Sequence, residues 1–201
     1  MGTQVILDIL SSMMIGGVLL LTLNQVNFNT ITTFFYYNND FILQSSLLDV
    51  ITIIENDLKR IAYAADPSLI AVPSECLKYA DSTTFRFMGD IDNNGSIEDI
   101  TYSLGPVSEL ANTKNPRDRI LYRTVNGGNK EMICTNVTQM MFEYFNYTKE
   151  KLSVPMIDAA AGEISAIQIS IEVQSPDAFE QDYNQAYWRQ LRLAIKNLRN
   201  R

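Results

Sequence analysis

The sequence predicts an α+β fold, in which a long hydrophobic N-terminal helix packs on a small antiparallel β-sheet domain. Three observations predict it: an almost uncharged apolar run at the N-terminus, a helical stripe of apolar residues after it, and several later segments whose polarity alternates. The 201 residues are enough for this helix and one compact domain. We place the helical region at 1–64 and the β-rich domain at 65–201.

The N-terminal segment has the length and composition of a membrane-spanning helix. Asp8 is the only charged residue from Thr3 to Asn39, and residues 5–23 match the ~20 residues that a helix needs to cross a bilayer core. A carboxylate in hydrocarbon costs about 2.5–3.5 kcal/mol on insertion scales, so we expect Asp8 to face a protein partner or to lie at the membrane interface.

A secretory signal peptide is the competing interpretation of this segment. Such peptides begin with basic residues, whereas the first basic residue here is Lys59. We therefore expect the segment to stay in the mature protein as a membrane anchor.

A second helical region follows an amide- and hydroxyl-rich stretch. Apolar residues recur at steps of three and four at positions 43, 47, 51, 54, 58 and 61, which predicts an amphipathic helix packed on a globular domain. Asn24 and the β-branched residues in 30–33 weaken helix propensity, so we expect a local break between the two regions. A continuous helix would run from about Gln4 to Tyr63.

The rest of the chain predicts strands. Alternating or aromatic-rich segments lie at 83–90, 97–105, 119–128, 137–145 and 166–174. The first two flank an Asn-Gly turn and predict a hairpin. The tail, 186–201, fits either a strand or a helix, and 108–118 and 155–163 have the composition of loops.

Charge and composition exclude several functions. The formal net charge of −7 argues against a nucleic-acid surface, which needs clustered Lys and Arg. The chain has no histidine, so it has neither an imidazole base nor a His-ligated metal. Phosphate-binding and dinucleotide fingerprints are also missing, and we expect a protein that is not an enzyme.

One acidic segment matches the front of a calcium-binding loop. Its oxygen-bearing residues are Asp90, Asp92, Asn94, Ser96, Glu98 and Asp99, with Gly95 at the position of the sharp turn. The Glu expected at loop position twelve is replaced by Thr101, and Glu98 or Asp99 would have to close the shell. An Asn-Gly hairpin explains the same residues without a metal, so both interpretations stay open.

The two cysteines, Cys76 and Cys134, also leave two alternatives. They would pair as a disulfide in an oxidising compartment, and they would otherwise be two buried free thiols.

This order of elements resembles the type IV pilin superfamily, and within it the minor pilins and minor pseudopilins of the larger W and J kinds. The resemblance lies in a hydrophobic helix that becomes amphipathic, followed by ADSTTFRFMGDIDNNGSIEDITYSL (80–104), RILYRTVNGG (119–128), VTQMMFEYFN (137–146) and a terminal LAIKNLRNR (193–201). It implies a pilin-like fold.

The resemblance also implies roles for individual residues. Thr3 stands at the glycine of the family's processing site, Gln4 at the first mature residue, and Asp8 at the family's glutamate; the chain differs from the family at all three. In the family this acid neutralises the amino terminus of a neighbouring subunit. Gly16 and Gly17 would let helices approach closely, and they are equally well explained as ordinary glycines of a membrane helix.

We therefore expect a minor pilin or pseudopilin of a type IV pilus or type II secretion-like filament. Its partners would be other pilin or pseudopilin subunits, the inner-membrane assembly machinery and the membrane. It would lie in a bacterial inner membrane with a periplasmic domain, or in a periplasmic or extracellular filament. The alternatives are a major subunit that forms its own filament, and a monomeric membrane-anchored periplasmic binding domain stabilised by calcium.

Overall fold

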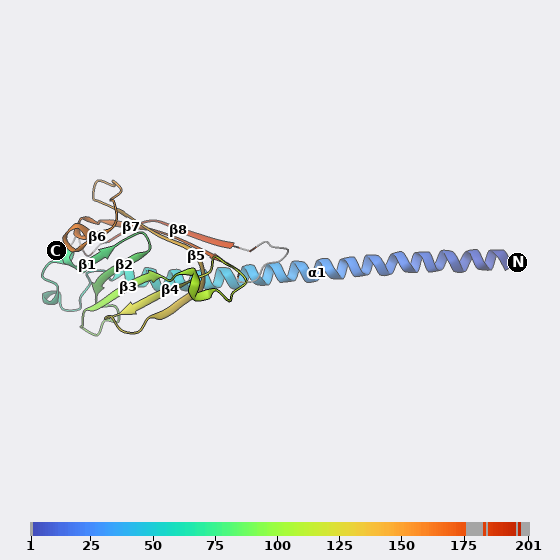
Figure 1. Cartoon of the computed structure of the whole chain (residues 1–201), viewed down its shortest axis with the longest axis horizontal. Coiled ribbons are helices and arrows are strands. Elements are labelled where there is room, and N and C mark those ends of the chain that lie inside the picture. Colours follow the sequence, from blue (N-terminus) through green and yellow to red (C-terminus); the bar gives the residue numbers. More distant parts are fainter. Residues whose placement is uncertain (1, 176–182, 184, 196, 198–201) are drawn as a thin grey trace. The chain divides into compact units, whose positions relative to one another are not determined.

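The computed structural model describes residues 2–175, 183, 185–195 and 197, and it confirms the α+β fold (Figure 1). Helix α1 spans Gly2–Lys59 and is followed by an antiparallel sheet. The chain divides into two compact units, Met1–Phe41 and Ile42–Arg201. The domain boundary after residue 64 stays a prediction, but residues 42–59 of α1 share one core with the sheet.

Helix α1 is continuous, so the break expected between residues 24 and 33 is wrong. The threonines that weaken helix propensity bond to their own helix: the Thr30 hydroxyl donates to the Val26 carbonyl over 2.8 Å, and the Thr22 hydroxyl to the Leu19 carbonyl over 2.9 Å. Propensity is a weak preference, and a long run of helical neighbours overrides it. The helix ends at Lys59, four residues before the expected Tyr63.

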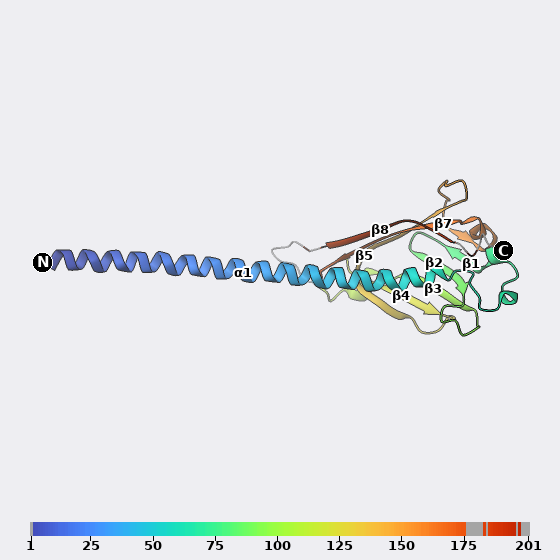
Figure 2. The ribbon, with the colours of Figure 1, turned by 180° about the vertical axis from the view of Figure 1, so that it is seen from behind.

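One curled sheet contains the described strands, all paired antiparallel in the order β6-β1-β2-β3-β4-β5-β7-β8 (Figure 2). The strands are β1 (Leu77–Ala80), β2 (Thr84–Gly89), β3 (Glu98–Leu104), β4 (Arg119–Val125), β5 (Glu131–Phe145), β6 (Met156–Ile157), β7 (Ala166–Gln174) and β8 (Gln185–Ala194). The predicted hairpin is confirmed, with β2 and β3 paired from Thr84 opposite Ser103 to Gly89 opposite Glu98.

The remaining segments agree with the sequence in part. The ambiguous tail forms strand β8 up to Ala194, and positions 196 and 198–201 lie outside the described residues. The first expected loop begins in a 3-10 helix, Val107–Leu110, and continues as turns. The second was expected to be a loop but contains β6 and a 3-10 helix, Asp158–Glu163. Two further 3-10 helices, Pro67–Leu69 and Pro73–Cys76, precede β1.

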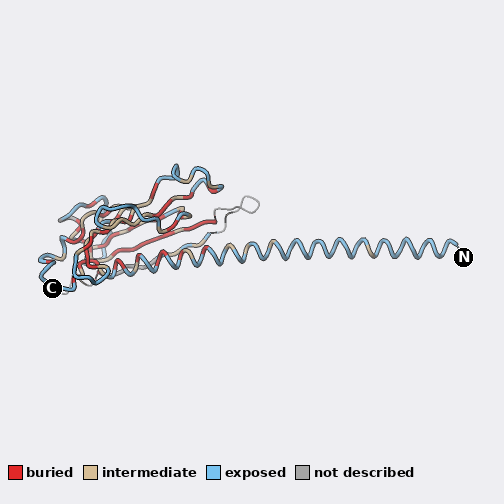
Figure 3. Tube along the Cα trace, turned by 90° about the horizontal axis from the view of Figure 1, so that it is seen from below, coloured by how far each residue is buried: buried red, intermediate tan, exposed pale blue. Residues whose placement is uncertain are grey.

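The core lies between the sheet and residues 42–59 of α1 (Figure 3). The predicted apolar stripe is buried, with Leu43, Leu47, Ile51, Ile54 and Leu58 in the helix and Ile61 just after it, and Val50 of the helix is buried as well. The sheet contributes alternate residues, among them Ile167, Ile169, Ile171 and Val173 on the predicted face of β7, all fully buried. Rings of Phe85, Phe87, Phe142 and Tyr144 pack together with centroids 5.3–6.3 Å apart.

The turn that follows α1 packs directly on the end of β2. The Ala62 amide donates to the Met88 carbonyl over 3.0 Å, and the Asp90 amide donates to the Tyr63 carbonyl over 2.8 Å. Gly89 lies between these two bonds, and a Cβ atom there would collide with the Arg60 carbonyl. This close approach fixes where the acidic loop after β2 begins.

Candidate functional site

The first unit is a helix, and most of its large apolar side chains are exposed among the described residues. Exposed fractions of its large hydrophobic side chains run from 36% at Phe35 to 75% at Met14. The most apolar 18-residue window of α1 has a mean hydropathy of 2.1 and is 0% buried. Among the described residues α1 is the one helix that is long and apolar enough to cross a membrane.

Asp8 is the one ionised side chain of this apolar segment, and it is exposed. The neighbouring hydroxyls bond to their own backbone: Ser11 donates to the Leu7 carbonyl and Ser12 to the Ile9 carbonyl, both over 2.8 Å. No hydrogen bond or ion pair joins Asp8 to another described residue. Its carboxylate therefore has to be satisfied by water or by a second molecule.

The other residues that the sequence assigns to assembly lie elsewhere on the helix surface. An α-helix turns by about 100° per residue, so Gly17, nine residues after Asp8, lies on the opposite face and Gly16 to one side. A Cβ atom on either glycine would meet nothing within 4 Å. Thr3 and Gln4 are exposed in the first turn of α1, and their role in processing stays a prediction.

The acidic loop between β2 and β3 brings together three of the predicted calcium ligands. One oxygen from each of Asp90, Asp92 and Glu98 lies within 4.8 Å of the others. Asp90 is fully buried and Glu98 is 8% exposed, because the loop folds over them. Three carboxylates in so small a volume repel one another, and a divalent cation would remove that repulsion.

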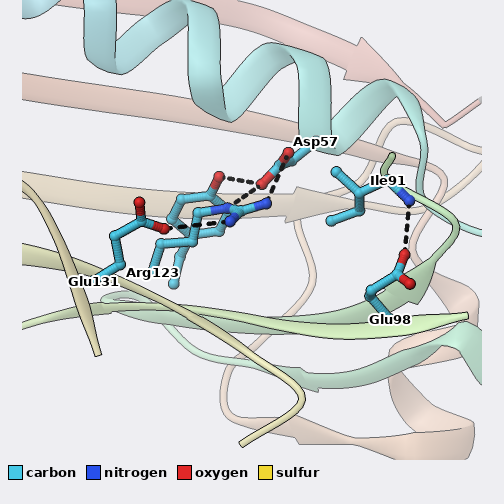
Figure 4. A network of polar contacts seen from close by, with 6 residues as sticks. Asp57, Ile91, Glu98, Arg123 and Glu131 are labelled. Atoms are coloured by element: carbon cyan, nitrogen blue, oxygen red, sulfur yellow. Dashed lines mark hydrogen bonds and ion pairs between the residues drawn. The ribbon is translucent and has the colours of Figure 1, made fainter. Parts of the chain in front are cut away.

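Backbone amides already hold these carboxylates in the structure. Asp90 accepts from the Asn94 and Gly95 amides, both over 3.1 Å, and Glu98 accepts from the Ile91 amide over 3.0 Å (Figure 4). Gly95 has φ +85°, a conformation that favours glycine. The loop is therefore shaped by its own hydrogen bonds, and either sequence interpretation fits its backbone.

The three remaining predicted calcium ligands are Asp99, Asn94 and Ser96, and the side chains of the first two form other contacts in the structure. Asp99 forms a bidentate ion pair with Arg86, with contacts of 2.5–3.0 Å, so its carboxylate already has a cationic partner, and its place in the ligand set stays a prediction. The Asn94 side chain bonds within the loop, donating to Asp92 and accepting from the Ser96 amide. Ser96 is exposed, and no contact of its side chain identifies it as a ligand.

Cys76 and Cys134 are both buried free thiols, which is the second of the two alternatives, and the disulfide is not formed. The Cys134 thiol donates to the Asn136 side-chain oxygen over 2.7 Å and lies 3.9 Å from the Ser46 hydroxyl. Burial raises the pKa of the Cys134 thiol, so it stays protonated at neutral pH.

A buried ion pair between α1 and the sheet escaped the sequence analysis (Figure 4). The Arg123 Nε donates to an Asp57 carboxylate oxygen over 2.7 Å, and the Tyr102 hydroxyl donates to the same oxygen over 2.6 Å. Asp57 is only 4% exposed. A useful signal in the sequence was an acid at position 57 on the apolar face of the helix, three residues after Ile54.

The electrostatics of this network keep it charged. Burial by itself would lower the pKa of Arg123, but the hydrogen bond and charge of Asp57 more than offset it and the pKa is raised. Burial, reinforced by the Asp57 charge, raises the pKa of Tyr102 well above its usual range. The network therefore joins residues 42–59 of α1 to β3 and β4.

A second polar cluster missed from sequence lies where the loop before β4 meets the end of β7. The Asn115 side chain donates to the Gln174 side chain over 3.1 Å. Asp118, 1% exposed, has two carboxylate oxygens that accept no hydrogen bond. Burial raises the pKa of Asp118.

The chain matches no protein-family model, and no curated protein has significant sequence similarity to it. Its class is therefore defined by architecture: a long apolar N-terminal helix followed by an antiparallel sheet, which is a pilin-like arrangement.

Proposed function

We propose that the chain is a structural subunit of a membrane-derived filament, a minor pilin or minor pseudopilin of a type IV pilus or a type II secretion-like system. The observation that carries this proposal is the exposed apolar helix of the first unit, in which Asp8 is the one carboxylate between residues 3 and 39. A helix that is apolar on all sides needs lipid or other helices around it. A filament core supplies the helices, and the membrane supplies the lipid before assembly.

Asp8 gives this proposal its specificity. A carboxylate costs about 2.5–3.5 kcal/mol at the centre of a membrane helix, so it needs an opposite charge from another molecule. The first unit contains no Lys or Arg. The amino terminus of a neighbouring subunit is a suitable partner, and the bond would act only in the assembled state.

In this proposal the protein lies in a bacterial inner membrane, with its sheet domain in the periplasm or on the filament surface. Its partners are other pilin-like subunits and the assembly machinery. It acts by binding rather than by catalysis. A major subunit would differ only in copy number, which is readily measured.

Charge reversal at Asp8 tests the proposal. Asp8→Lys should abolish recovery of the chain in filaments sheared from cells, while the protein still accumulates in membranes. Asp49→Lys is the matched control, since Asp49 is an exposed acid of the same helix beyond the apolar segment. Equal recovery of both variants in sheared filaments would contradict the role given to Asp8.

A second proposal concerns the acidic loop: Ca²⁺ bound by Asp90, Asp92 and Glu98 would stabilise the sheet domain. The convergence of their oxygens within 4.8 Å favours it. Stabilisation by bound Ca²⁺ would fit a filament subunit. It would fit equally well the alternative function, a monomeric membrane-anchored binding domain. Recovery of the chain only from detergent-extracted membranes, with Asp8→Lys unchanged in behaviour, would favour that alternative.

A further inference from the structure

The first unit carries an apolar seam with the spacing of a coiled coil. Its members are separated by alternate steps of three and four residues: Leu21, Asn24, Phe28, Ile31, Phe35 and Asn38. A repeat that averages 3.5 residues keeps one stripe of a helix facing a partner helix that coils around it. Leu21 is 71% exposed, and Phe28 and Ile31 are each 62% exposed, so the described residues leave these three side chains of the stripe accessible.

Two asparagines interrupt the apolar seam at equivalent positions. Asn24 and Asn38 are two heptads apart, and both are exposed. Neither side chain has a hydrogen bond to another described residue. An amide inside an apolar contact is costly unless another amide or hydroxyl faces it, because both its donor and its acceptor need partners.

The partner that satisfies both asparagines is an identical seam. We infer that a second copy of this chain docks on this seam, parallel and in register. Asn24 then faces Asn24 of the second copy, and Asn38 faces Asn38 of the second copy. In each pair the NH2 group of one asparagine can donate to the side-chain carbonyl of the other. A shift by one layer would oppose each asparagine to an apolar residue such as Leu21 or Phe28 and leave its amide unsatisfied. An asparagine at the a position is known to fix register in coiled coils, and Asn24 and Asn38 occupy the d position of the same kind of seam.

The charges of the first unit are compatible with this pairing. Asp8 and Asp40 fall outside the repeat that contains Asn24 and Asn38, so two identical chains do not oppose carboxylates in the seam. Gly17, the next position of the same repeat toward the N-terminus, would let the two backbones come close. The parallel direction follows from anchoring, since two copies inserted in one membrane by the same route point the same way.

The inference rests on the proposed membrane anchoring, and it is independent of filament assembly. It describes a homodimer in the membrane, whereas subunits stacked along a filament are displaced from one another along its axis. Identical positions are adjacent in the first case and separated in the second. This difference makes the two arrangements distinguishable by cross-linking.

Single cysteines introduced into the full chain test the pairing in native membranes. Asn24→Cys and Phe28→Cys lie in the seam, and Val26→Cys is the control on the opposite face. Oxidation should produce a disulfide-linked dimer for the two seam variants at least about tenfold more than for Val26→Cys or for the wild type. The buried native thiols, Cys76 and Cys134, provide the background in the wild type.

A second variant tests whether the two helices pair in register or are only close to each other in the membrane. Asn24→Asp places like charges opposite each other, so in combination with Phe28→Cys it should abolish the cross-link while the protein remains in the membrane fraction. Cross-linking equal at positions 24, 26 and 28, or retained in Asn24→Asp, would overturn the pairing. Membrane retention without any cross-link would refute the dimer alone, and absence from the membrane fraction would refute both the dimer and the proposed anchoring.

Discussion

Helix α1 carries large apolar side chains along its whole length, but they are mostly buried in the second unit of the chain and mostly exposed in the first. Ile54, in the second unit, is fully buried, whereas Leu20, in the first, is 64% exposed. After residue 42 most apolar residues share one buried face, with Leu48 and Ile53 exposed, and the acids Asp49 and Glu55 lie off that face. Before residue 24 apolar residues occupy every face. The first pattern needs one covering sheet, and the second needs apolar surroundings on all sides.

The same contrast applies to two of the carboxylates of the helix, one in each unit. Asp57 is buried and paired with Arg123 over 2.7 Å, whereas Asp8 has no partner among the described residues. The chain thus supplies the counter-charge for one acid and leaves the other for a second molecule. Folding uses Asp57, and we propose that assembly uses Asp8.

The largest expected effect comes from removing the buried acid. Asp57→Ala should destabilise the sheet domain by about 3–5 kcal/mol, because it removes the buried partner of Arg123 and leaves that charge only its long contact with the exposed Glu131. Denaturation of the full chain in detergent, followed by the fluorescence of its single tryptophan, Trp188, would measure this. Glu131→Ala is the control: Glu131 contacts the same Arg123 over 3.5 Å but is exposed, and it should cost under about 1 kcal/mol. Similar losses in both variants would contradict the account.

A matched pair of truncations compares the two units directly. Ile54→Ala should lower the free energy of unfolding of the sheet domain by about 2–5 kcal/mol, because it opens a cavity in a fully packed core. Leu20→Ala, in the first unit, should change it by no more than about 0.5 kcal/mol. The same denaturation assay applies, and a large effect of Leu20→Ala would show that the first unit supports the folded domain.

Calcium should raise the stability of the second unit alone, because the acidic loop lies in that unit. If the acidic loop binds Ca²⁺, an ion concentration 100 times the Kd should stabilise the domain by about 2.7 kcal/mol, and a chelator should reverse the effect. Asp90→Asn should remove the response, while Asp99→Asn, which only breaks an exposed pair with Arg86, should retain it. Unfolding curves that are the same with Ca²⁺ and with chelator would contradict the calcium site.

The smallest expected effect concerns the unpaired carboxylate of Asp118. Its pKa is raised by burial, so its contribution to stability is complete below the unfolded pKa of ~3.9 and is lost as pH rises through the folded value. Asp118→Asn should therefore stabilise the domain at pH 7 by about 1 kcal/mol and have less effect at pH 4.

The control for this effect is Asp66, whose pKa is lowered by the Ser68 amide. Asp66→Asn should show the opposite dependence, because stability from Asp66 is present above the unfolded pKa and is lost as pH falls through the folded value. Stability profiles of Asp118→Asn and Asp66→Asn with the same sign would contradict the assignment.

The fold was predictable because its patterns are strong and local. Steps of three and four residues identified the buried face of α1, and strict alternation identified the buried face of β7. Short elements carried too little pattern, which is why β6, with two residues, was taken as part of a loop. The break expected near Asn24 failed because intrinsic propensity is smaller than the cooperativity of a long helix.

The candidate sites were predictable only where their residues are close in sequence. Asp90, Asp92 and Glu98 were found because nine residues of one loop bring them together. Asp57 and Arg123 are far apart along the chain, and only the packing of helix on sheet places them in contact. Asp99 pairs with Arg86 on the neighbouring strand, a cross-strand contact that spacing alone does not reveal.

Electron microscopy of material sheared from expressing cells, with antibody labelling of this chain and mass spectrometry of its N-terminus, tests the central claim most directly. The account predicts labelled filaments: few sites, at tips or bases, for a minor subunit, and labelling along their length for a major one. Recovery of the chain solely from detergent-extracted membranes, with no labelled filament, would contradict the claim that its exposed helix assembles into a filament core.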